Sequence, residues 1–195
     1  MPQPSPAPKF PTITVGLRPF DSDEPPAVSS LLATIYALPS GAVHLEYALE
    51  GHIDALCIPQ AEEPSQDPLW QHTCFEAFIS VPEGEYYREY NFSPSGLWAT
   101  GEFLHYRENI TLLEGEKSIT LPVGCKQSDT RLTLTAEVPP ILLPASPILR
   151  VGLTAVVEYS DGHLGYWALH HPDDRPDFHH PGGWTLRLDT RQVTR

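Results

Sequence analysis

The feature that most constrains the fold of this chain is a period of two in its hydrophobic pattern. In the segment VHLEYALEG, apolar side chains alternate with a mostly polar set from Val43 to Leu49. Successive side chains of a β-strand point to opposite faces, so the alternation predicts a strand with one face on a core and the other toward water. The same alternation recurs in RLTLTAEV, residues 131–138, and in LRVGLTAVVEY, residues 149–159.

Turn residues separate further short strands along the chain. Glycine reaches positive φ without steric cost, so Pro39-Ser40-Gly41 and Asp161-Gly162 predict hairpin turns. An amphipathic helix competes with a strand at 28–38, and we prefer the strand because Ile35 and Tyr36 lead directly into a turn. Strands are also predicted at 12–17, 30–38, 73–81, 86–92, 97–106, 118–122, 163–169 and 184–188.

These short strands, without a convincing long helix, predict an all-β fold: an antiparallel sandwich or a barrel of about ten strands. The 22 prolines fit this prediction, because proline ends strands and blocks edge pairing but is poorly tolerated inside helices. No internal repeat or linker divides the chain, so we expect one domain over residues 12–190. Residues 1–11, with five prolines, are predicted to be a flexible N-terminal segment, and 191–195 a C-terminal tail.

The charge balance narrows the possible partners. The chain has 12 Lys plus Arg against 25 Asp plus Glu, a formal net charge of −13, and no basic cluster. Such a surface repels phosphate backbones and anionic lipids, so we expect neither nucleic acid nor a membrane surface as partner. No signal-peptide pattern and no stretch of about 18 apolar residues occurs, which predicts a cytoplasmic protein. The three cysteines form no CxxC pair and are expected to be reduced thiols. No pattern predicts the oligomeric state.

Two segments combine aromatic rings with polar groups. In LWQHTCFEAFIS, Trp70 and His72 precede a strand that carries Glu76 among apolar residues. A carboxylate there must face solvent or a ligand, or be paired or protonated if it is buried. In YYREYNFSPSGLWATGEF, Asn91 lies close in sequence to Trp98. A flat ring beside amide and carboxylate groups is typical of a sugar site, although a core tryptophan is the plainer interpretation of Trp98.

A third segment, HHPDDRPDFHH, holds four histidines and three aspartates in residues 170–180. Extended backbone turns neighbouring side chains to opposite faces, so at most one histidine of each His-His pair readily serves one ion. A site of His170 and His179 with Asp177 or Glu158 is conceivable, but no HExxH-like spacing occurs. Calcium at the three aspartates is a further alternative, and an acidic surface loop is the default interpretation.

The motifs LWQHTCFEAFI, YREYNFSPSGLWA, AVVEYSDGHLGYWALHHP and PDFHHP, in this order and spacing, resemble the bacterial DOMON-like domain proteins. That group is related in fold to DOMON domains and to the family-nine carbohydrate-binding modules, and the likeness covers about residues 28–190. The resemblance implies a β-sandwich with a ligand pocket on one sheet. The better-known relatives bind haem or sugars.

The resemblance also implies a set of ligand-binding positions. Where relatives tend to have an aromatic residue after two small ones, this chain has Trp98-Ala99-Thr100-Gly101, so one aromatic wall of a shared pocket is expected to be missing. Carried over to this chain, the implied ligand-binding residues are Trp70, Glu76, Tyr90, Asn91, Trp98, Glu158, Trp167, His170, His179 and His180. His72, which lies close to Trp70 just before the strand, completes the predicted ligand-binding set.

The function that these patterns favour is non-catalytic binding of a small ligand, first of all a carbohydrate or a sugar-derived metabolite. The first alternative is an enzyme that uses glutamate and histidine as acid and base on a similar ligand. The second is a haem-binding domain. The only methionine is Met1, so the Met/His ligation of cytochrome-type DOMON domains has no candidate here, and ligation by histidine alone or by histidine and cysteine remains. The loop 170–180 is expected to form one wall of the pocket, with the strand from LWQHTCFEAFIS as the opposite wall.

Overall fold

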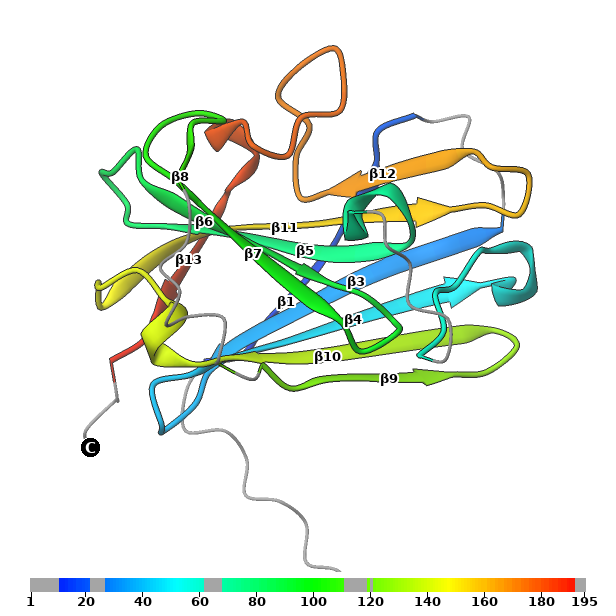
Figure 1. Ribbon diagram of the computed structural model, residues 1–195, viewed down its shortest axis with the longest axis horizontal. Coiled ribbons are helices and arrows are strands. Elements are labelled where there is room, and N and C mark those ends of the chain that lie inside the picture. The colour runs from blue at the N-terminus through cyan, green and yellow to red at the C-terminus, as the bar shows by residue number, and fades with distance from the viewer. Residues whose placement is uncertain (1–10, 22–26, 62–67, 111–118, 120, 192–195) are drawn as a thin grey trace, which may run out of the picture.

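Two antiparallel sheets make up the structure, a computed structural model that describes residues 11–21, 27–61, 68–110, 119 and 121–191 (Figure 1). The five-stranded sheet has the order β1 (Ile13–Gly16), β3 (Val28–Ala37), β4 (Val43–Gly51), β10 (Arg131–Val138), β9 (Val123–Gln127). The eight-stranded sheet has the order β2 (Arg18–Pro19), β12 (Leu164–Ala168), β11 (Ile148–Glu158), β5 (Cys74–Ser80), β6 (Tyr87–Phe92), β7 (Trp98–Phe103), β8 (Asn109–Ile110). In that sheet β13 (Leu186–Asp189) also pairs with β11.

The 3₁₀ turns are short and lie in the connections. Their bounds are η1 (Ile53–Ala55), η2 (Leu69–Gln71), η4 (Pro140–Leu142) and η5 (Pro181–Gly183). Among the described residues, no helix has the length and apolar character needed to cross a bilayer. The two antiparallel sheets confirm the all-β sandwich expected from the sequence.

The core lies between the two sheets and follows the period of two. On β4 the apolar side chains of Val43, Leu45, Tyr47 and Leu49 are fully buried, and a continuous apolar cluster joins them to β5, β10 and β11. Burying one such side chain stabilises the fold by roughly 1.5–3 kcal/mol, so a strand shifted by one residue would lose this term at every alternate position. The hydrophobic pattern thus fixes the register.

The strand predicted at 30–38 is correct, because β3 runs from Val28 to Ala37 and pairs with β4 along its length. The turn between them ends at Gly41, whose φ of 84° is a conformation that glycine adopts without strain. The prediction at 118–122 is wrong where the structure can test it. Residues 118 and 120 lie outside the described residues, and the strand β9 begins only at Val123. Proline at 122 disfavours a strand there, since it has no backbone N–H to donate to a neighbouring strand.

The outer face of the eight-stranded sheet carries an unusual set of polar side chains. On β5, Phe75 and Ala77 point into the core, and the alternating positions 74, 76 and 78 therefore point outward. Register then places Glu76 between Asn91 on β6 and Thr154 on β11. The segment between β12 and β13, orange to red in Figure 1, folds over this face. The face is thus covered at one end and open at the other.

Candidate functional site

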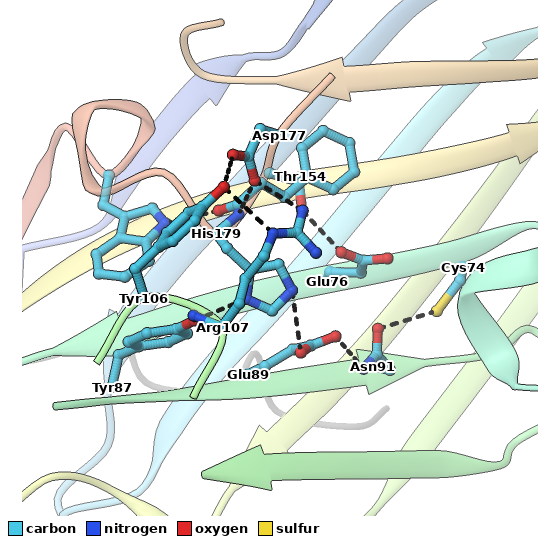
Figure 2. A network of polar contacts seen from close by, with 12 residues as sticks. Cys74, Glu76, Tyr87, Glu89, Asn91, Tyr106, Arg107, Thr154, Asp177 and His179 are labelled. Carbon is cyan, nitrogen blue, oxygen red and sulfur yellow. Dashed lines mark hydrogen bonds and ion pairs between the residues drawn. The ribbon is translucent and has the colours of Figure 1, made fainter. Parts of the chain in front are cut away.

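A cleft of about 490 Å³ lies on the outer face of the eight-stranded sheet, between β5–β7 and the segment that joins β12 to β13. Glu76, Glu89 and Asn91 contribute polar groups from β5 and β6, while Phe178 and His179 line the cleft from the covering segment. The two segments expected to form opposite walls of a pocket therefore line the same cleft. Figure 2 shows how these polar groups converge.

Glu76 is the most deeply buried charged group of the cleft. Its side chain is only 2% exposed, and its Oε2 accepts a hydrogen bond of 3.3 Å from the hydroxyl of Thr154. Burial raises the pKa of Glu76 well above the ordinary range of a carboxyl group, and repulsion from Glu89 raises it further. The hydrogen bond from Thr154 acts in the opposite direction but is outweighed.

Glu89 lies beside it on β6, on the same face as Asn91 two residues later. The amide of Asn91 donates a 2.7 Å hydrogen bond to Oε1 of Glu89. Burial raises the pKa of Glu89, and the hydrogen bond from Asn91 and the charge of Arg107 only partly oppose this effect. The floor of the cleft thus contains two carboxyl groups whose ionisation costs free energy.

His179 reaches into the cleft from the covering segment as a neutral side chain. Burial, with a smaller contribution from the positive charge of Arg107, lowers its pKa to about 4. Its Nδ1 lies 2.7 Å from the hydroxyl of Tyr87, and that hydroxyl already accepts the backbone N–H of Arg107 at 3.1 Å. We therefore assign the Tyr87 proton to the bond with Nδ1, which leaves the N–H on Nε2, 3.7 Å from Glu89 Oε2.

Arg107 and Asp177 hold the covering segment against the β7–β8 turn. A guanidinium nitrogen of Arg107 lies 2.9 Å from the carboxylate of Asp177, which also accepts a 2.5 Å hydrogen bond from the hydroxyl of Tyr106. Burial acts to raise the pKa of Asp177, but the bonds from Tyr106 and Arg107 outweigh it and lower that pKa. Arg107 has φ 58°, a left-handed conformation uncommon for a residue with a side chain. The positive charge of Arg107 is thus already paired with the carboxylate of Asp177.

Trp70 lies at the rim of the cleft, in the turn η2 just before β5. Its side chain is 49% exposed, so a large part of the indole ring is available for contact with a ligand. An exposed flat ring at the mouth of a polar cleft can stack on the C–H face of a pyranose.

Packed aromatic rings support the end of the cleft under the covering segment. Phe78 stacks on Trp184 with ring centroids 6.0 Å apart and an interplanar angle of 11°. This close approach is possible because position 152 is glycine: a Cβ there would lie 2.2 Å from Cδ1 of Trp184. Phe78 also contacts Phe178 at 6.5 Å, so the wall and the floor are packed against each other.

Small residues keep the β7 side of the cleft open. Ala99 and Gly101 line the cleft there, and a Cβ at Gly101 would approach the ring of Phe103 to 2.9 Å. Trp98 pairs directly with the core residue Phe92 and packs against the core, so its ring does not line the cleft. On this strand the cleft is therefore lined by small residues, as expected from the missing aromatic residue at Gly101.

The other predicted site residues lie outside the cleft. Trp167 is a core residue because it points to the same side as the buried Ala155 opposite it, and Tyr90 lies in the core with its hydroxyl bound to the Leu142 carbonyl. His72 and Glu158 bind each other, with 2.8 Å between Nδ1 and Oε2, beyond the cleft residues on β5 and β11.

Two of the loop histidines also lie apart from the cleft. His170 is exposed, and His180 accepts the backbone N–H of Gly182 at 3.0 Å, which caps η5. His179 and His180 point to different places, but they do so in a turn closed by the bond from the His180 N–H to the Asp177 carbonyl, and not in the extended backbone that was expected. Of the predicted set, the structure brings together Trp70, Glu76, Asn91 and His179.

Several cleft residues were missed by the sequence reasoning. Glu89 could have been found, since it lies two residues before Asn91 and so shares its face. Tyr166 on β12 was missed because its neighbour Trp167, which lies on the opposite face of the strand, was assigned to the pocket. Arg107 could not, because its position depends on a left-handed turn and on a contact with a distant segment.

The residues of the cleft fit neither haem nor a metal ion. Within the described residues, no three His, Cys, Asp or Glu side chains gather in a way that could hold a metal. Among these residues His179 is the histidine that lines the cleft, and its two ring nitrogens face Tyr87 and Glu89. Ligation of haem iron would have to break the bond with Tyr87 or turn the ring away from Glu89.

Comparison with known proteins identifies similar structures but no relative by sequence. No family model matches the chain, and no curated protein matches it significantly. A presumed carbohydrate-binding protein from Bacteroides uniformis has a TM-score of 0.67 and 13% identity, with 91% of this chain and 85% of that chain covered. A family 9 carbohydrate-binding module from Caldicellulosiruptor kristjanssonii in complex with cellotriose has a TM-score of 0.54 and 10% identity, with 85% and 79% covered.

The same kind of module from Caldicellulosiruptor kristjanssonii in complex with glucose has a TM-score of 0.53 and 9% identity, with 87% of this chain and 83% of that chain covered. This likeness establishes the fold. The chain has the sandwich architecture of carbohydrate-binding modules, and at such low identity its function has to be argued from its own cleft.

Proposed function

We propose that this protein binds a carbohydrate, without catalysis, in the cleft on the outer face of its eight-stranded sheet. The observation that carries the proposal is the combination of the half-exposed Trp70 ring at the rim with Glu76, Glu89 and Asn91 on the floor. A pyranose has an apolar C–H face and a ring of hydroxyl groups, so it needs both a flat partner and directed acceptors. Glucose and cellotriose, the ligands of the similar modules, support the same class of ligand.

The size of the cleft favours a short sugar. Its volume of about 490 Å³ lies within the range of roughly 300–1,000 Å³ that is typical of small-ligand sites. The covering segment encloses one end of the cleft. On the β7 side the small residues Ala99 and Gly101 leave room for a ligand. A ligand that enters over Trp70 would place its polar groups against β5 and β6.

Calorimetric titration with glucose and cellotriose tests the proposal. We expect saturable binding that Trp70→Ala weakens by up to about tenfold, since an aromatic contact contributes roughly 0.5–1.5 kcal/mol. Tyr36→Ala is the matched control, because Tyr36 lies on the other sheet, stacked on His44. Binding that both variants leave unchanged would place the ligand elsewhere, and no binding of either sugar would remove the support that the similar modules give.

A second candidate function is acid–base catalysis on a similar ligand. Glu76 and Glu89 both have a raised pKa in one cleft, which is a property that general acids require near neutral pH. The decisive measurement is whether a sugar that binds is also converted. Turnover that Glu76→Gln abolishes while binding persists would replace the non-catalytic proposal with the catalytic one.

The finer points of the sequence interpretation remain proposals. We propose membership of the bacterial DOMON-like group on the four motifs quoted above, and a single domain over residues 12–190. A cytoplasmic location and the absence of nucleic-acid and membrane partners rest on the charge and on the pattern of the chain's sequence alone.

A further inference from the structure

We propose that the sugar bound in this cleft carries a protonated amino group, which Glu76, Glu89 and Asn91 bind together. The inference rests on the proposed function, because it names the class of sugar that the same cleft takes. It goes beyond the sugars of the similar modules, which are neutral.

Glu76 has unmet hydrogen-bonding capacity. Its carboxyl group is 2% exposed and lines the cleft, yet within the described part of the chain its only side-chain hydrogen bond is the 3.3 Å contact of Oε2 with Thr154. No described donor reaches Oε1. A buried carboxylate with an open acceptor is costly unless a donor or a proton is supplied, and the cleft is the side from which a donor can come.

The charges of the cleft point to the same ligand group. Glu76 and Glu89 repel each other across the floor of the cleft. Arg107 also lines the cleft, but its guanidinium is bound to Asp177, and His179 is neutral above pH of about 4. Because the raised pKa of both floor carboxyl groups leaves a proton on the free cleft, an ammonium group would take the place of that proton, which is released to solvent, and its charge would balance the two carboxylates.

The number of acceptors on the floor matches an ammonium group. An ammonium group has three N–H donors, whereas a hydroxyl group has one. The floor offers a carboxylate oxygen of Glu76, a carboxylate oxygen of Glu89 and Oδ1 of Asn91. Among the described residues, that amide oxygen receives only a 3.8 Å contact from the thiol of Cys74 (Figure 2). A neutral sugar hydroxyl would use one acceptor and leave the repulsion between the carboxylates unbalanced.

The test is a set of calorimetric titrations with glucosamine, glucose and N-acetylglucosamine at pH about 6, where a primary amine of this type is protonated. We expect glucosamine to bind at least about tenfold more tightly than either neutral sugar, as charge-assisted hydrogen bonds allow. Glu76→Gln and Glu89→Gln keep the shape of the side chain and remove its charge, so each should reduce this preference to within about threefold. Glu46→Gln, on the other sheet, removes the same charge far from the cleft and should keep the preference.

The outcomes separate this inference from the proposed function. Equal binding of glucosamine and glucose would overturn the inference and leave carbohydrate binding in place. A failure of all three sugars to bind would overturn both. A preference for glucosamine that survives both Glu76→Gln and Glu89→Gln would overturn the inference, and if Glu46→Gln reduces that preference, the cause is the net charge of the protein. Thermal unfolding of each variant shows whether it is folded, and Glu89→Gln provides the test if Glu76→Gln is not.

Discussion

Replacing Glu76 by glutamine is expected to stabilise the protein, by an amount that grows with pH. The carboxyl group of Glu76 is 2% exposed, and burial together with repulsion from Glu89 raises its pKa well above the ordinary range. In the unfolded chain the same group ionises near its usual value of about 4.3. Between these two pKa values the folded protein holds a proton that the unfolded chain has released.

The sign and size of the effect follow from this difference in bound protons. Where the folded state binds one proton more, the free energy of unfolding falls by up to about 1.4 kcal/mol for each unit of rising pH. The contribution of this proton to the free energy of unfolding is therefore fully present below pH of about 4, and it is lost as the pH rises through the pKa of Glu76 in the folded protein. For a chain of this size, 1 kcal/mol corresponds to roughly 2–4 °C in Tm. Glutamine does not titrate, so the variant should gain roughly 3–6 °C in Tm over wild type per pH unit in this window.

The assay is thermal or urea unfolding of wild type and Glu76→Gln at pH 4, 5, 6, 7 and 8. Glu46→Gln on β4, in the other sheet, is the control and should follow wild type. A difference in Tm between wild type and Glu76→Gln that stays constant from pH 4 to pH 8 would show that Glu76 ionises normally and would refute the reasoning.

Two further predictions concern the support of the cleft. Gly152→Ala should lower the free energy of unfolding by about 1–3 kcal/mol, since the new Cβ would meet Trp184 at 2.2 Å. Gly16→Ala, whose Cβ would meet nothing closer than 3.9 Å, should change it little, and equal losses in urea unfolding would contradict the packing argument. Arg107→Ala should cost about 1–2 kcal/mol at neutral pH, because it removes a partner of the buried Asp177 carboxylate while Arg107 itself is half exposed. The folded pKa of Asp177 is lowered, so this cost should shrink as the pH falls below about 4, and a pH-independent cost would argue against the ion pair.

The fold was largely predictable because its determinant is local. Alternation between buried and exposed positions is written directly in β4, β10 and β11, and each strand has to match it to keep its apolar side chains between the sheets. The short strands β2 and β8 escaped prediction because two residues carry no period. The strand β9 was placed too early, since its start depends on pairing with β10.

The site was predictable only in part, because it depends on which face each residue takes and on a contact between distant segments. Glu76 and Asn91 could be chosen because they are polar residues within strands. The assignment of Trp167 to the pocket was wrong, since residue type alone does not distinguish an indole in the core from one that lines a pocket. The place of His179 depends on Tyr87, 92 residues earlier in the chain, and that pairing leaves no local signal.

The most direct test of carbohydrate binding in this cleft is a crystal structure determined from crystals of the protein that have been soaked in a saturating concentration of glucose or glucosamine. We expect electron density for the sugar in the cleft, stacked on Trp70, with its polar groups within hydrogen-bonding distance of Glu76, Glu89 or Asn91. Density for the sugar on the five-stranded sheet or at any other place, with this cleft free of it, would contradict the proposed binding site.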